Sequence, residues 1–266
     1  MQIIILFHNM LKNKTFIKIS TLLSFLVMIL INALANILPI NSITTGEISD
    51  AYPNLFAPAG ITFSIWGLIY FSLAVYVFYQ FLPKSKKIVT LINKINIYFI
   101  LSSIANTAWI FLWHYQMIGF SVFLMLVILY SLIKISSLTN QGDLSKKDKL
   151  YTKIPFGLYF GWITIATIAN ITTFLVSIGW QNFILSDQVW TMIILLVGMV
   201  IASITTIKER NLFYGLVPIW AYFGIYLKHT SASYFNNNYP SVVVIVIICI
   251  AIFIGVDGYL LAKKSI

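Results

Sequence analysis

The sequence predicts an all-α integral membrane protein, and three observations lead to this class. Hydrophobic residues make up 60% of the 266 residues, charged residues make up 9%, and the mean hydropathy is +0.92. A globular domain has about 25% charged residues. The apolar residues gather in runs of about 20, which is the length of a helix that crosses a bilayer. A soluble domain, a disordered chain and a coiled coil are excluded, and so is a secreted disulfide scaffold, because Cys249 is the one cysteine.

Eight membrane-spanning helices are predicted along the chain. They are residues 18–39, 57–82, 95–114, 118–137, 154–179, 189–207, 212–228 and 241–262. The longest external loop is residues 40–56, a lysine-rich cytoplasmic loop covers 138–153, and 180–188 form a short external turn. Residues 1–180 therefore form a five-helix bundle, and residues 181–266 form a plainer extension of three helices that no soluble linker separates from it.

The basic residues predict the orientation in the membrane. The chain has 17 basic and 7 acidic residues and a formal net charge of +10. With loops assigned alternately, one side holds Lys12, Lys14, Lys18, Lys84, Lys86, Lys87, Lys94, Lys134, Lys146, Lys147, Lys149, Lys153, Lys208, Arg210, Lys263 and Lys264. The other side holds Lys228. This asymmetry predicts a multi-pass protein of the cell membrane with both termini cytoplasmic. Membrane lipid, and not nucleic acid, is the expected partner of these charges.

The first span has a second interpretation. Basic residues precede its apolar stretch, and Ala33, Leu34 and Ala35 are similar to the small-residue cleavage site of a secretory signal. Cleavage there would leave seven spans. The stretch from Phe16 to Ile40 is long for a signal core, which favours an uncleaved anchor.

Three of the spans carry aromatic and amide side chains along one helix face. These faces are Phe63, Trp66 and Tyr70 in the second span; Asn106, Trp109 and Trp113 in the third; and Tyr159, Trp162, Ala166, Asn170 and Thr173 in the fifth. Pro58, Ala59 and Gly60 are expected to open the second span, because proline costs little in the first turn of a helix.

An asparagine in hydrocarbon must find hydrogen bonds, so Asn106 and Asn170 are expected to point into the bundle. Two arrangements satisfy this requirement. The asparagines can bond across helices while the tryptophans fill the core. Alternatively, indole rings and a few amides can wall a cavity for a flat apolar ligand.

Three segments resemble the TspO/MBR family, the translocator proteins or tryptophan-rich sensory proteins. They are PAGITFSIWGLIY at residues 58–70, ANTAWIFLW at 105–113 and GWITIATIAN at 161–170. Their order and spacing cover roughly residues 18–180, and the long first loop is a further family feature. The chain departs from the pattern at Pro155, which lies seven residues before Trp162 and not four, and in its three additional C-terminal helices.

The resemblance implies a five-helix bundle whose cavity is closed by the first loop and binds porphyrins or other flat apolar molecules. Carried onto this chain, it implies a binding site made of Phe63, Trp66, Tyr70, Asn106, Trp109, Trp162, Ala166 and Asn170. A porphyrin, either protoporphyrin or haem, is a possible ligand. No obligate cofactor and no metal site are expected, because no histidine lies deep in a span. A homodimer is possible.

Other chemistry has weaker support. Asp257 is the one acid placed within a span, and its position near Lys263 favours pairing at the interface over a transport role. No phosphate-binding glycine loop, metal-ligand cluster or nucleophile elbow is present in the sequence. Catalytic residues are not predicted, and a binding or sensory protein is expected. Secondary transport of a small hydrophobic or amphipathic solute and porphyrin breakdown are the alternatives.

Overall fold

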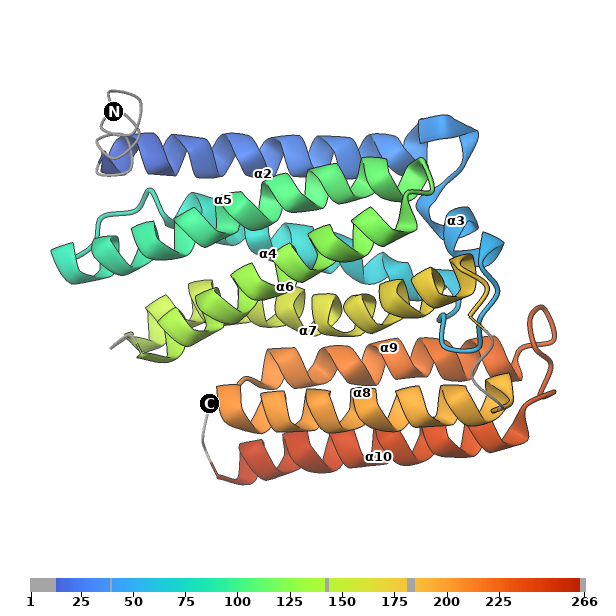
Figure 1. Ribbon diagram of the computed structural model, residues 1–266. Helices are drawn as coiled ribbons and strands as arrows, with labels where there is room; N and C mark the ends of the chain where they lie inside the picture. Colours follow the sequence, from blue (N-terminus) through green and yellow to red (C-terminus); the bar gives the residue numbers. More distant parts are fainter. Residues whose placement is uncertain (1–12, 39, 142–143, 181–184, 264–266) are drawn as a thin grey trace.

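Eight long helices lie side by side in the computed structural model, which describes residues 13–38, 40–141, 144–180 and 185–263 (Figure 1). They are α2 (Lys14–Ile37), α4 (Ile65–Tyr79), α5 (Lys86–His114), α6 (Ile118–Gln141), α7 (Lys146–Ser177), α8 (Asp187–Glu209), α9 (Leu212–Thr230) and α10 (Pro240–Ala262). The start of α2 and the end of α10 lie at the same end of the bundle (Figure 1). Lys12 and Lys264, which the charge analysis includes, lie outside the described residues.

Seven candidate membrane spans occur within the described ranges. They are these helices except α9, and the span of α4 includes the 3-10 turn before it, so that it covers Gly60–Tyr79. The chain is therefore a multi-pass membrane protein. The eighth crossing, by α9, and the cytoplasmic location of the termini stay predictions.

Polar residues at the loop ends determine where five helices begin. The side-chain oxygens of Asn13, Ser85, Ser145, Ser186 and Asn211 accept hydrogen bonds from free backbone amides in the first turns of α2, α5, α7, α8 and α9. The Ser145 cap lets α7 begin at Lys146, within the predicted cytoplasmic loop at 138–153. Since α6 also continues to Gln141, most of that loop is helical. Hydropathy marks where a helix leaves the apolar layer, whereas the cap marks where its hydrogen bonds begin.

The second span begins later than the sequence predicts. A 3-10 turn at Gly60–Ser64 precedes α4, and Ala59 before it is extended, with φ −60° and ψ 147°. Pro58 therefore lies outside the helix and not in its first turn. The physical reasons are local and tertiary: proline disfavours a helical conformation at Ala57, and the amide of Ala59 donates to the carbonyl of Gly224, 3.0 Å away in α9.

The α7 helix lies at the centre of the molecule. It packs on α4, α6 and α9, and more of it is buried than of any other candidate span. Gly161 permits the contact with α9, because a Cβ there would come within 2.8 Å of the Tyr214 carbonyl oxygen and of Val217. Small residues at such positions allow helix backbones to approach closely. The last three helices are thus joined to the first five along the seam between α7 and α9.

Candidate ligand-binding site

Aromatic side chains of α4 and of the 3-10 turn before it, which contains Phe63, meet those of α7 inside the bundle. The rings of Trp66 and Trp162 are 6.2 Å apart between centroids and stand at 78°. Phe63 meets Trp162 edge-to-face at 5.9 Å, and Trp66 meets Tyr159 at 5.9 Å. Such edge-to-face pairs contribute about 0.5–1.5 kcal/mol beyond their buried area. The rings thus point toward one another, and none of these four is directed away from the bundle.

A cavity of about 70 Å³ lies at this meeting point, and residues of α4, α5 and α7 line it. Its walls include six of the eight predicted residues: Phe63, Trp66, Trp109, Trp162, Ala166 and Asn170. Ligand sites usually enclose roughly 300–1,000 Å³, whereas a water molecule takes up about 30 Å³. In this conformation the cavity therefore holds at most a few waters, and a macrocycle requires it to widen.

A second hollow, of about 330 Å³, adjoins the first beneath the segment at 40–64, which joins α2 to α4. The charge pattern predicts that this segment is external, and we call it the external loop. The two share Thr45, Phe63, Trp66 and Trp109 as lining residues. Tyr70 lines the second hollow, and its ring stacks on Trp66 at 5.1 Å. The Tyr70 hydroxyl is buried and has no hydrogen-bond partner within the described part of the chain. Because an unmet buried hydroxyl costs about 1–3 kcal/mol, a polar group of a bound molecule would be stabilised there.

The two asparagines are used mainly to join helices. Asn106 accepts from Asn32 Nδ2 at 2.7 Å and donates to the Tyr159 hydroxyl at 3.4 Å, and it lines neither hollow. Asn170 accepts from Trp109 Nε1 at 2.9 Å and donates to Ser121 Oγ at 2.9 Å. Both asparagines therefore bond across helices, which was the first of the two arrangements expected from the sequence. Asn170 also lies on the cavity wall, so this residue both joins helices and contributes to the cavity.

The external loop covers the cavity and is fixed to the end of α5. It contains a 3-10 turn at Ile40–Ser42 and the short helix α3 (Thr45–Ala51). His114 donates from Nδ1 to the Ile40 carbonyl at 3.0 Å, and its Nε2 lies 3.0 Å from Thr45 Oγ1. Trp113 Nε1 donates to the Thr45 carbonyl at 3.1 Å. Both imidazole nitrogens of His114 are thus occupied by the loop.

Helix α3 begins with a reciprocal cap between Thr44 and Glu47. Glu47 Oε2 accepts from the Thr44 amide at 2.7 Å and from the Thr44 hydroxyl at 2.7 Å. These hydrogen bonds hold the pKa of the Glu47 carboxyl below its usual value. The bond from the Thr44 backbone has the larger effect, and the bond from the Thr44 hydroxyl has the smaller one. The loop therefore carries its own local structure in addition to its bonds to α5.

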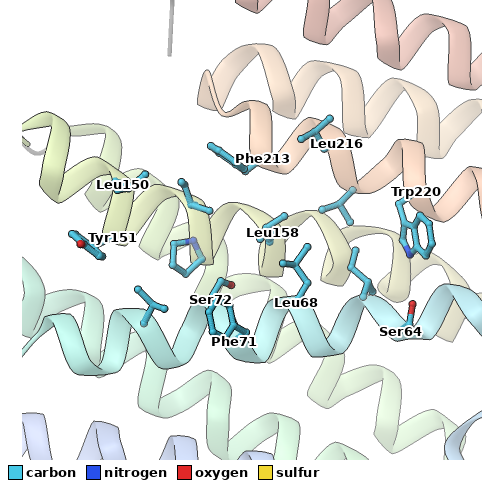
Figure 2. A pocket seen from close by; sticks show the side chains of 15 residues that line it. Ser64, Leu68, Phe71, Ser72, Leu150, Tyr151, Leu158, Phe213, Leu216 and Trp220 are labelled. Carbon is cyan, nitrogen blue, oxygen red and sulfur yellow. The ribbon is translucent and has the colours of Figure 1, made fainter.

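A larger hollow, of about 680 Å³, lies on another face of α4 (Figure 2). Phe213 and Leu216 of α9 face Leu68 and Phe71 of α4 across it, over the surface of α7. Its walls are almost entirely apolar, and the hydroxyl of Ser72 is bonded to the Ile69 carbonyl at 2.8 Å. A specific ligand site needs a few free polar groups. We therefore regard the aromatic hollows as the better candidate despite their smaller volume.

Sequence reasoning missed several residues around the aromatic hollows. They include Asn32 and Asn36 of α2, Thr45 and Ser49 of the loop, and Met125. Trp113 lines the smaller cavity too; the sequence placed it on the aromatic face of the third span but not in the site. The two asparagines could have been found, because they lie four residues apart in an otherwise apolar span. The loop residues give no comparable signal, since their position depends on how the loop folds back.

Asp257 does not pair at the interface as the sequence suggests. It is 5% exposed in α10, and neither carboxylate oxygen has a hydrogen-bond partner within the described residues. Its side chain lies against Gly215 of α9, where a Cβ would collide with Oδ1. Helical geometry explains the difference, because the side chain at this position faces α9 and does not extend toward the helix end. No group of three or more potential metal ligands occurs among the described residues.

These features define a class: a multi-pass helical membrane protein whose aromatic helix faces converge beneath the loop between α2 and α4. The family model described as TSPO-like protein matches residues 18–259. The chain therefore belongs to the TSPO-like family, which confirms the resemblance seen in the sequence. The match continues through α8 and α9 and most of α10, beyond the segments that carry the motifs. Comparisons with curated proteins and with solved structures find no match.

Proposed function

We propose that the protein is a membrane-embedded binding or sensory protein that accommodates a porphyrin-like or other flat apolar ligand. The observation that carries this proposal is the convergence of Phe63, Trp66 and Trp162 on one cavity beneath the external loop. Aromatic walls suit a flat ligand because they supply stacking and edge contacts. The buried hydroxyl of Tyr70 supplies one polar contact for orientation.

Apolar contact is sufficient for such binding without a metal bond. At about 0.3 kcal/mol per heavy atom, a macrocycle of roughly forty atoms reaches about 12 kcal/mol. The cost is a widening of the 70 Å³ cavity so that it merges with the adjoining 330 Å³ hollow. Phe63, Trp66 and Trp109 line both spaces, so rotation of these side chains would remove the partition.

Protoporphyrin titration of the purified protein in detergent tests the proposal. We expect saturable quenching of tryptophan fluorescence, and we expect the Trp66→Ala, Trp162→Ala double variant to bind at least tenfold more weakly. A matched control is Trp180→Ala with Trp190→Ala, two rings that pack on each other at 4.7 Å away from the aromatic hollows. Equal affinity in both double variants would refute the site.

A second candidate function, secondary transport of a small amphipathic solute, rests on Asp257. A buried carboxylate in a membrane helix commonly marks a proton or ion pathway, and this one is 5% exposed with both oxygens unpartnered in the described residues. Proton-dependent solute uptake into vesicles that is lost in Asp257→Asn would establish this function. Uptake that is unchanged in the variant would remove it.

A further inference from the structure

The external loop is attached to two different parts of the molecule. Its first half, around Ile40 and Thr45, is bonded to the end of α5, which also contributes to the cavity wall. Its second half, from Asp50 to Thr62, contacts α9, which lies in the C-terminal extension. The loop therefore connects the cavity to helices that do not line the aromatic hollows.

Four hydrogen bonds connect the second half of the loop to one side of α9. They are Trp220 Nε1 to the Thr62 carbonyl at 2.9 Å, the Ala59 amide to the Gly224 carbonyl at 3.0 Å, Lys228 Nζ to Asp50 Oδ1 at 2.9 Å, and His229 Nε2 to the Leu55 carbonyl at 2.9 Å. Trp220, Gly224 and Lys228 are spaced by four residues, so they share one face of the helix. We call this set of four bonds the α9 latch.

Close packing reinforces the α9 latch. A Cβ at Gly224 would lie 1.9 Å from Thr62 Oγ1, so only glycine allows the loop to sit this close to the helix. Phe56 of the loop meets Tyr222 of α9 edge-to-face at 6.4 Å. Both rings are fully buried. The second half of the loop is thus packed against α9 as part of the protein core.

The ion pair of the latch is asymmetric. The Lys228 side chain is 10% exposed, whereas that of Asp50 is 64% exposed. If Asp50 were removed, the Lys228 ammonium would remain with little access to water. An unpaired buried charge destabilises a protein far more than the loss of an ion pair between two exposed side chains. This contact also gives a structural reason for Lys228, the one basic residue that the charge pattern assigns to the external side.

The latched segment forms part of the cavity wall. Ala57 and Pro58 line the 70 Å³ cavity, directly before Ala59, which bonds to Gly224. Releasing residues 50–62 from α9 would therefore move Ala57 and Pro58 away from Trp66 and Trp162.

We propose that α9 holds the external loop closed over the aromatic cavity, and that release of the α9 latch admits the ligand. This inference rests on the proposed ligand-binding function, and it assigns the C-terminal helices a role in regulating access to that site. The C-terminal extension then controls a cavity that it does not line.

Cysteine labelling measures access without any ligand. Cys249, which is buried, is first replaced by serine so that it cannot react. Ala166→Cys then places a thiol on the cavity wall. The latch variant combines Trp220→Phe, which removes the indole donor, with His229→Leu. Because it lacks two buried hydrogen bonds, we expect a water-soluble maleimide to react about tenfold faster with residue 166.

Two comparisons control this experiment. Tyr226→Phe removes a hydroxyl from α9 whose ring stacks on Phe223 of the same helix, and it should leave the labelling rate unchanged. Asp50→Lys should raise the rate, and Asp50→Lys with Lys228→Asp should restore it, since the exchanged pair can form again. Equal rates in the wild-type, latch and Asp50→Lys proteins would overturn the proposal.

Hydrogen exchange and protoporphyrin binding separate the two proposals. Exchange of the amides at residues 50–62 should be faster in the latch variant of the full-length protein, and protoporphyrin should associate faster with it. If labelling and exchange accelerate while protoporphyrin binds neither protein, the latch stands and the proposed ligand fails. If protoporphyrin binds both proteins at the same rate, the latch proposal fails and the ligand proposal stands.

Discussion

One buried polar side chain in the helices up to α7 and one in the three helices after it are accommodated differently. Asn170 in α7 accepts a hydrogen bond at Oδ1 from Trp109 Nε1 and donates one from Nδ2 to Ser121 Oγ. Asp257 in α10 is equally buried, but neither of its oxygens is bonded within the described residues. Asn170 thus locks helices beside the aromatic cavity, whereas Asp257 stays unsatisfied beside Gly215. Each region also contains the other kind of group, since the Tyr70 hydroxyl of α4 has no partner within the described residues and the Tyr222 hydroxyl of α9 donates to the Leu195 carbonyl at 2.8 Å.

Under the proposed function, the two regions contribute in different ways. The first supplies the aromatic walls, and its polar groups hold these walls in place. The second contributes through α9, which packs on α7 at Gly161 and contacts the external loop through the α9 latch. A buried acid without partners is costly for stability, so its presence in α10 marks a position where stability is not the only requirement.

The largest effect is expected at the seam between the two regions. Gly161→Ala places a Cβ 2.8 Å from the Tyr214 carbonyl oxygen, and a backbone atom cannot move aside as a flexible side chain can. Overpacking of this kind costs about 1–3 kcal/mol. We expect a clearly lower Tm in detergent. Gly255→Ala is the control, because nothing lies within 4 Å of its added Cβ. Equal Tm values for both variants would mean that the regions are not tightly joined here.

The next largest effect on stability is expected at the Asn170 side chain, whose amide is hydrogen-bonded to two neighbouring helices. Asn170→Leu should destabilise the protein by about 1–3 kcal/mol, because it leaves the Trp109 indole N–H and Ser121 without their partner. Thermal unfolding in detergent measures the loss. Thr173→Val one turn away serves as a control, since the Thr173 hydroxyl bonds to the Ala169 carbonyl of its own helix. A stable Asn170→Leu variant would remove the contrast between the two regions.

The unsatisfied acid should respond in the opposite direction. Asp257→Asn keeps the shape of the side chain and removes its ability to carry charge, so we expect stability to be unchanged or raised by less than about 1 kcal/mol. The same unfolding assay checks this. A large loss of stability in Asp257→Asn would show that a charge partner is present and that the two regions follow the same rule.

The smallest effect lies in the external loop. Because hydrogen bonds from Thr44 hold the pKa of Glu47 below its usual value, the folded loop favours the carboxylate. The ionised Glu47 carboxylate therefore stabilises the folded loop fully at pH values above its usual pKa. This stabilisation is lost as the pH falls through the lowered pKa. Glu47 is fully exposed, so we expect only a modest rise in amide exchange at residues 45–51 from about pH 6 to about pH 3, corrected for intrinsic rates.

Glu47→Gln is the matched control for this pH dependence. Glutamine can form the same reciprocal cap with Thr44 but does not titrate. The variant should therefore retain its exchange protection across the same range. A similar pH dependence in both proteins would assign the effect to another group.

Several features of the site could be predicted from the sequence alone. The spacing of Phe63, Trp66 and Tyr70 placed these side chains on one helix face, and the motifs of the second, third and fifth spans indicated the family. The sequence could not show that Asn106 bonds to Asn32 of α2, because that pairing depends on which helices become neighbours. Nor could it give Trp220 a role, since its partner Thr62 lies 158 residues earlier.

The amino-acid sequence by itself determined that the chain is a helical membrane protein, which residues share a helix face, and which family it resembles. These properties depend on apolar run length and on local helical periodicity, and both can be read within one segment. Only the tertiary structure decided how wide the aromatic cavity is, where Asp257 points, and that α9 holds the external loop. These properties depend on contacts between segments far apart in the chain, where a difference of one ångström between helix backbones decides whether a space is open or filled.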